Sequence, residues 1–184
     1  MLPAAWNPPT VAHLALAEAA LNFADEVLLV LPRIFPHKGF EHAGFELRLE
    51  WLRRIAASQM GLGVGVTGGG LFLEMARALR APDARVEHVY IVCGRDAAER
   101  FLNWPYEHGP GASEQLREFS LLVAPRGKPF EPPDSLRASI HALNLDPKLC
   151  GISSTDVRQR IAHGESWTDL VPDEIAAEAG GVYR

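Results

Sequence analysis

The hydrophobic pattern of the chain alternates between short apolar runs and stretches in which apolar residues recur with helical spacing. Each run has the length of a strand rather than a helix, and continuous apolar strands are typical of a parallel sheet buried on both faces. The runs that we predict to be strands are residues 27–31, 62–66, 89–93 and 121–124.

The periodic stretches between these runs predict helices. We expect them over residues 10–22, 45–58, 71–80 and 96–102, with a further helix from about Ser154 and a last one from Pro172. Pro172 suits the first helical turn, where its missing N–H would have no partner in any case. Gly164 is placed to end the helix before it.

Strands that alternate with helices predict an α/β fold with a Rossmann-like, doubly wound parallel sheet. The length of 184 residues fits a single domain over 1–184, in which about 150–184 form a helical C-terminal part. Ligands of such folds bind outside the carboxyl ends of the strands. Two long connections rich in Pro and Gly, 32–44 and 103–113, are therefore candidate functional loops.

Composition and charge narrow the classes of partner. A formal net charge of −5 argues against a surface for a nucleic acid polymer, which needs a basic stripe. The chain has neither an apolar run near the roughly 20 residues that span a bilayer nor a signal-peptide pattern at its start, so we expect a cytoplasmic protein without membrane binding. A homo-oligomer stays open. Cys93 and Cys150 are expected to be buried thiols, with no metal site.

The first candidate for chemistry is the turn Asn7-Pro8-Pro9-Thr10, which opens a helix. Thr10 and His13 lie one helical turn apart at its positive end, where a phosphate would meet free N–H groups and a favourable dipole. From these residues alone we favour a structural interpretation, in which Thr10 caps the helix and His13 is an ordinary, partly buried histidine.

The second candidate is Ile152-Ser153-Ser154-Thr155-Asp156-Val157-Arg158, which places three hydroxyls at a helix start and an arginine one turn inside. Such a segment is a natural anion cradle. The alternative is a capping motif formed by Ser153 and Asp156, with Val157 and Ile161 as the buried stripe of the helix. Either opening alone is a weak signal, whereas two in one α/β chain are a stronger one.

These segments resemble the motifs of a known superfamily. Trp6-Asn7-Pro8-Pro9-Thr10-Val11-Ala12-His13 resembles the (H/T)xGH nucleotidyltransferase motif, and residues 152–158 resemble the ISSTxxR motif. The chain is most similar to the nicotinate and nicotinamide mononucleotide adenylyltransferases. The other segments that carry the resemblance are Pro36-His37-Lys38, Gly94-Arg95-Asp96 with Trp104, and Leu170-Val171-Pro172.

The resemblance implies transfer of AMP from ATP to the phosphate of a pyridine mononucleotide, with release of pyrophosphate, in NAD biosynthesis. No protein nucleophile is used in such enzymes, and Mg²⁺ travels with ATP. The implied catalytic residues are His13, Thr10 and Arg158. The implied ATP-binding residues are Asn7, Gly94, Asp96, Arg126, Ser153, Ser154 and Thr155, and the implied substrate-binding residues are Lys38 and Trp104.

Several of these residues have a plainer interpretation. Lys38 is equally consistent with a solvated loop lysine, and Asp96 with a cap of the helix that follows its strand. A tryptophan such as Trp104 is more often a core residue than a stacking platform. Arg126 follows an apolar strand and either reaches the nucleotide or faces water. Gly68-Gly69-Gly70 lacks the lysine of a phosphate-binding loop, so we expect a flexible turn between strand and helix.

The sequence departs from the family pattern at two places. The family opens with a buried strand that ends in Gly-Gly-Ser/Thr-Phe, whereas only residues 1–5 precede Trp6, so we expect a first strand that is missing or very short. This departure favours an alternative, a truncated or degenerate homologue that binds nucleotide without turnover. Gly70-Leu71-Phe72-Leu73 replaces a hydroxyl-rich stretch, so adenylyl or cytidylyl transfer to another phosphate acceptor also stays open.

Overall fold

The computed structural model describes residues 1–34, 43–80, 85–125 and 130–184. Its strands pair in parallel throughout, in the orders β1-β2-β3 and β4-β5-β6. The strands are β1 (Leu2–Pro3), β2 (Val27–Pro32), β3 (Leu62–Thr67), β4 (Tyr90–Gly94), β5 (Ser120–Ala124) and β6 (Ile140–Ala142).

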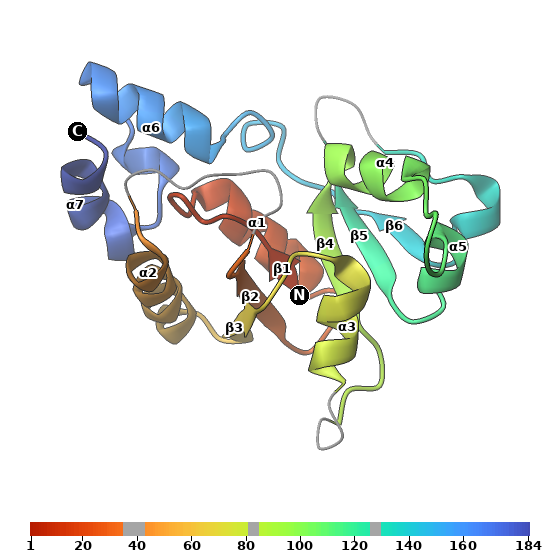
Figure 1. Ribbon diagram of the computed structural model, residues 1–184. Coiled ribbons are helices and arrows are strands. Elements are labelled where there is room, and N and C mark those ends of the chain that lie inside the picture. Colours follow the sequence, from red (N-terminus) through yellow and green to blue (C-terminus); the bar gives the residue numbers. More distant parts are fainter. Residues whose placement is uncertain (35–42, 81–84, 126–129) are drawn as a thin grey trace.

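Hydrogen bonds of Met1 join the two groups of strands. The amino group of Met1 donates to the carbonyl of Tyr90 at 2.7 Å, and the carbonyl of Met1 accepts from the N–H of Val92 at 2.8 Å. The strands therefore lie in the order β3-β2-β1-β4-β5-β6, which Figure 1 shows across the molecule. This is the order of a Rossmann-like, doubly wound sheet, so the predicted fold class is confirmed.

Helices cover both faces of the sheet. Residues that alternate along β2 show this: Leu29 packs in one apolar cluster with α1, α2, α6 and α7, and Val30 packs in the other with α3 and α4. Continuous apolar strands are therefore explained by burial on both sides. The helices are α1 (Val11–Ala20), α2 (Phe45–Ser58), α3 (Phe72–Leu79), α4 (Arg95–Asn103), α5 (Ala112–Gln115), α6 (Ser154–His163) and α7 (Asp173–Val182).

The first strand is short, as expected. Only Leu2–Pro3 forms regular strand, although the N–H of Ala4 also donates to the carbonyl of Val30 at 3.2 Å. Despite its length, β1 occupies the centre of the sheet between β2 and β4. The loop that leaves it is therefore surrounded by structure on both sides.

The predicted elements match the structure closely, with three differences. Gly164 ends α6 in the left-handed conformation, at a φ of 71°, as expected. The prediction for Pro172 was wrong by one position, because it has an extended ψ of 142° and precedes α7 as its N-cap. The sequence analysis missed β6, which is a three-residue strand with a polar residue at its centre, and the single turn α5, which begins near the end of the 103–113 connection and extends beyond it.

Candidate functional site

The candidate site lies at the carboxyl edge of the sheet, between β1 and β4. The strand order reverses there, since the chain continues from β1 towards β2 on one side and β4 lies on the other. Open α/β sheets bind ligands at this kind of switch point. The loop after β1 leads directly into α1, and Gly94 at the end of β4 is the N-cap of α4.

The loop between β1 and α1 is packed inside the protein. Residues 6–10 are all buried, and Trp6 is fully buried with its indole Nε1 donating to the carbonyl of Val30 at 2.7 Å. Trp6 has a φ of 53°, a conformation that a bulky residue rarely adopts. Its ring lies 4.9 Å from the ring of His13, measured between centroids. The loop therefore has a defined, constrained shape before any ligand binds.

Thr10 and His13 form a reciprocal cap at the start of α1. The hydroxyl oxygen of Thr10 accepts from the N–H of His13 at 3.4 Å, and Nδ1 of His13 accepts from the N–H of Thr10 at 3.1 Å. The same Nδ1 lies 2.7 Å from the Thr10 hydroxyl. Because Nδ1 is an acceptor, we assign the proton of the neutral ring to Nε2. The expected cap is thus present, and it also fixes the orientation of His13.

Electrostatics keep His13 neutral in the absence of a ligand. Burial lowers the pKa of His13 to about 4, because the positive imidazolium would lose its hydration. The residue as a whole is only partly buried, so part of it remains accessible to solvent. A neutral imidazole with a proton on Nε2 can donate one hydrogen bond to an anion.

The start of α6 is more open. Ser153 is the N-cap and accepts from the N–H of Asp156 at 3.1 Å, while Val157 and Ile161 are buried. The capping interpretation of this segment is therefore confirmed. Ser153 and Thr155 are nevertheless exposed, so the helix start is accessible to a ligand.

Direct hydrogen bonds bring the two motif segments together. The Ser154 hydroxyl donates to the carbonyl of Pro8 at 2.7 Å, and the Arg158 guanidinium donates to the carbonyl of Asn7 at 2.6 Å. Arg158 also donates to the Thr155 hydroxyl at 3.4 Å. Figure 1 shows α6 crossing above the loop that leads into α1. Two segments far apart in sequence are therefore in direct contact.

The site residues predicted beside β4 lie at the two ends of α4. Gly94 is the N-cap of α4 without a side-chain hydrogen bond, and Asp96 is exposed in the first turn, so Asp96 is not the N-cap of this helix. Trp104 follows the helix and is 52% exposed, which excludes the core interpretation for its ring. The predicted residues Lys38 and Arg126 lie outside the described residues.

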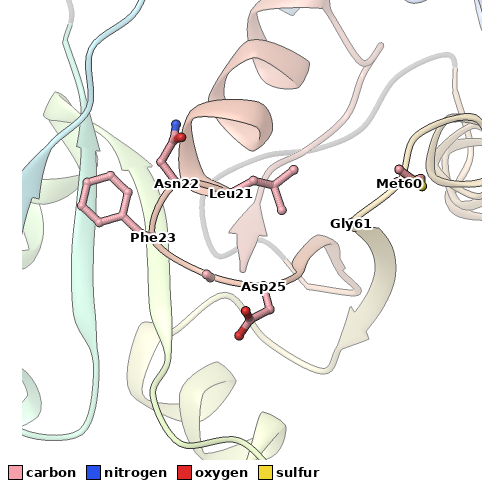
Figure 2. Close-up of a pocket in the computed structure, with 7 residues that line it drawn as sticks. Leu21, Asn22, Phe23, Asp25, Met60 and Gly61 are labelled. Atoms are coloured by element: carbon pink, nitrogen blue, oxygen red, sulfur yellow. The ribbon is translucent and has the colours of Figure 1, made fainter.

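A surface pocket lies at the opposite edge of the sheet (Figure 2). It is formed where α1 ends and where β2 and β3 begin, and it contains none of the predicted site residues. In the figure the Phe23 side chain points away from Met60. The residues that line it are Leu21, Asn22, Phe23, Ala24, Asp25, Met60 and Gly61.

The described parts of the chain hold no group of three or more His, Cys, Asp or Glu side chains arranged to bind a metal ion. Among the same residues, no helix is both long and apolar enough to cross a membrane.

Cys93 is buried, as expected, whereas Cys150 is only partly buried, so that expectation holds for one of the two thiols.

Two residues at the site were missed by the sequence analysis. Arg48 of α2 is buried and donates to the carbonyl of Ala5 at 2.7 Å, and Tyr183 donates to the side-chain oxygen of Asn7 at 2.5 Å. A charged residue between Leu47 and Leu49 on the apolar stripe of a helix was a usable signal for Arg48. Tyr183 had no such signal, because its partner is distant in sequence.

Comparison with known proteins gives a consistent picture. The model of the cytidylyltransferase-like family matches residues 1–160. A relative from Anaeromyxobacter dehalogenans strain 2CP-C is 32% identical, covering 100% of this chain and 95% of the relative. A relative from Gemmatimonas aurantiaca is 27% identical, covering 97% of this chain and 89% of the relative. Both are named as probable nicotinate-nucleotide adenylyltransferases.

Proposed function

The chain belongs to the cytidylyltransferase-like family of nucleotidyltransferases, and from this premise we propose that it transfers AMP from ATP to a pyridine mononucleotide. The reaction would release pyrophosphate and form a dinucleotide in NAD biosynthesis. The names of the relatives support this substrate class. We further propose that residues 1–184 act as one domain, because α7 packs in the same apolar cluster as α1 and α2.

The observation that carries the proposal is the contact between the two motif segments. Ser154 and Arg158 of α6 hydrogen-bond to the loop that opens α1, so two helix starts converge beside the switch point of the sheet. First-turn N–H groups without an intrahelical partner and the helix dipole favour an anion at a helix start. A triphosphate carries several anionic groups, which suits a site with two such ends.

In this proposal His13 contacts the α-phosphate through Nε2–H. The cap holds Nδ1 and leaves Nε2 as the donor, which fits a group that stabilises charge as it develops. Thr10 acts behind His13, since its side chain is fully buried against the ring. Thr10 thus orients the imidazole rather than touching phosphate.

The start of α6 would bind the remaining phosphates. Ser153 and Thr155 are exposed there, and Arg158 supplies a permanent positive charge. Asn7 and Ser154 would support the phosphates from the contact between the segments.

The other proposed roles rest on the resemblance. Gly94 and Asp96 would meet the adenosine, Trp104 would stack on the pyridine ring, and Lys38 and Arg126 would meet the mononucleotide phosphate and the nucleotide. The exposure of Asp96 and Trp104 supports contact with ligands.

The chemistry needs positioning rather than a protein nucleophile. A phosphate oxygen of the mononucleotide attacks the α-phosphorus, and the bond to the oxygen that bridges the α- and β-phosphorus breaks as pyrophosphate leaves. The residues above would hold the two anions in line and stabilise the developing charge. Mg²⁺ bound to the triphosphate would supply further charge, and it needs no dedicated cage of carboxylates.

A panel of acceptors tests the proposal. Pyrophosphate release from ATP and Mg²⁺ is measured with nicotinate mononucleotide, nicotinamide mononucleotide, phosphopantetheine and no acceptor. We expect release only with a pyridine mononucleotide. A His13→Ala sample purified in the same way reports contaminating activity. Release with phosphopantetheine alone, or equal release without acceptor, would contradict the proposal.

An acceptor other than a pyridine mononucleotide, such as phosphopantetheine, has one specific observation in its favour. Leu71, at the N-cap of α3, is 60% exposed, and Ile34 beyond β2 is 66% exposed. Both follow the carboxyl ends of strands, where an acceptor would bind. Apolar side chains at these positions suit an acceptor with an apolar arm better than one recognised by hydroxyl groups.

A further inference from the structure

Two side chains outside the motifs hold the loop between β1 and α1. One is Arg48, which comes from α2, and the other is Tyr183, which is the C-cap of α7. Each is only 3% exposed, so neither can touch a nucleotide in this conformation. Each nevertheless hydrogen-bonds to a residue of the loop that precedes Thr10.

Arg48 binds the start of this loop. Its guanidinium donates to the carbonyl of Ala5 at 2.7 Å and to the carbonyl of Gly44 at 3.4 Å. Burial lowers the pKa of Arg48, yet a guanidinium remains protonated at any ordinary pH. A buried charge is costly unless it is hydrogen-bonded, and the carbonyls of Gly44 and Ala5 are two of the acceptors that offset this cost.

Tyr183 binds the middle of the loop. Its hydroxyl donates to Oδ1 of Asn7 at 2.5 Å, which fixes the orientation of the Asn7 amide. Burial raises the pKa of Tyr183, so the phenol stays protonated and remains a donor. The ring lies 6.3 Å from the ring of Trp51 between centroids, which holds it against α2.

Side chains of α2 and α6 engage three carbonyl oxygens of the loop. The carbonyl oxygens of Ala5, Asn7 and Pro8 all accept from side chains, namely Arg48, Arg158 and Ser154. A carbonyl oxygen that faced an anion would repel it. These hydrogen bonds satisfy three carbonyl oxygens of the loop and offset the negative charge that they would otherwise present to a nearby anion.

The loop depends on these side chains for its shape. Regular strand ends at Pro3, and Trp6 holds a positive φ of 53°, so backbone pairing alone does not account for the conformation. We propose that Arg48 and Tyr183 are positioning residues that hold the loop, and Asn7 in particular, in the conformation that binds ATP. This inference rests on the proposed function, because it takes Asn7 to be part of the nucleotide site.

Tyr183→Phe removes one hydroxyl and keeps the ring in place. We expect the KM for ATP to rise about tenfold, as for the loss of one buried hydrogen bond, with the KM for the acceptor unchanged. In an Asn7→Ala background the same substitution should produce no further change, because its effect passes through Asn7. A lower melting temperature with an unchanged KM for ATP would overturn the inference.

Arg48 provides the second test. Arg48→Met should raise the KM for ATP at least as much as Tyr183→Phe, and Arg48→Lys should restore part of the loss because it keeps a charged donor. Ser58→Ala is the matched control, since it removes a hydroxyl that joins α2 to Glu174 of α7 without touching the loop. An equal rise in the KM for ATP in Ser58→Ala would assign the effect to the α2 and α7 contact and overturn the inference.

Calorimetry separates this inference from the proposed function. If the wild-type chain binds ATP but forms no product with any acceptor, the proposed function fails, and the ratio of ATP dissociation constants still decides the role of Arg48 and Tyr183. A roughly tenfold weaker binding by Tyr183→Phe, with Ser58→Ala equal to wild type, supports the inference. Equal dissociation constants in all three proteins overturn it.

Discussion

The two helix starts at the candidate site differ in how they meet the solvent. At α1, residues 6–10 are all buried, and Thr10 is occupied by its bonds to His13. At α6, Ser153 and Thr155 are exposed, although Ser153 also caps its helix. The capping residue of α6 is therefore exposed to solvent, whereas the capping residue of α1 is buried.

From this difference we infer that the two helix starts have different roles in the reaction. The α1 side presents a preorganised shape, in which Thr10 fixes the proton and the orientation of His13. The α6 side presents the exposed residues Ser153 and Thr155 together with the charge of Arg158. Preorganised donors contribute most where charge develops, whereas adaptable donors contribute to ground-state binding.

Replacing His13 should have the largest effect on turnover. We expect His13→Ala to lower kcat about 10²- to 10³-fold, as for the loss of one donor aimed at developing charge. His163→Ala is the matched control, because His163 is exposed at the far end of α6. Steady-state pyrophosphate release measures both. Equal activity of His13→Ala and wild type would contradict the proposed difference in role between the two helix starts.

Replacing Arg158 should act mainly on binding. Arg158→Ala should raise the KM for ATP about 10- to 100-fold, as expected for a charge-assisted hydrogen bond, with a smaller change in kcat. Arg160→Ala serves as the control on the same helix, since Arg160 pairs with Asp156. A loss confined to kcat would show that both helix starts act in the same way.

The pH dependence of stability should report His13. Its pKa in the folded state is about 4 against 6.5 for an ordinary histidine, so the unfolded chain binds more protons between these values. Stability should therefore fall with decreasing pH in this window, by on the order of 2 kcal/mol from pH 6.5 to 5. Denaturant unfolding measures the slope. His13→Asn should lose this component, and an unchanged slope would contradict the burial of the ring.

Removing the capping hydroxyl should lower the free energy of unfolding by a different amount at each of the two helix starts. Thr10→Val should cost about 1–2 kcal/mol, because the hydroxyl is buried and bonded twice, and Ser153→Ala about 0.5–1 kcal/mol, because its oxygen is exposed. Chemical denaturation of both variants gives the comparison. A larger cost for Ser153→Ala than for Thr10→Val would contradict the assignment of α1 as the preorganised helix start.

Much of the fold was predictable because hydrophobic period and length agree along this chain. Helix α2 was predicted at its exact bounds, Phe45–Ser58, since its apolar stripe is regular and ends cleanly. Strand β6 was missed because Ile140–Ala142 is too short to show a pattern and is stabilised by its pairing with β5. Short elements depend on tertiary contacts that periodicity does not carry.

The candidate site was predictable in part. The meeting of residues 7–13 with 152–158 followed from the resemblance, and the structure contains the hydrogen bonds between them. The contacts of Arg48 and Tyr183 with the loop could not be predicted, because each joins residues that are distant in sequence and only the folded chain brings them together. The roles assigned to individual residues stay predictions.

The most direct test of the central claim follows the phosphorus atoms of ATP. The protein is incubated with Mg²⁺, nicotinate mononucleotide and ATP labelled either at the α- or at the γ-phosphorus. Transfer of AMP predicts that the α-label enters a dinucleotide and that the γ-label is recovered only in pyrophosphate. A γ-label on the acceptor, or an α-label that never joins it, would contradict the claim.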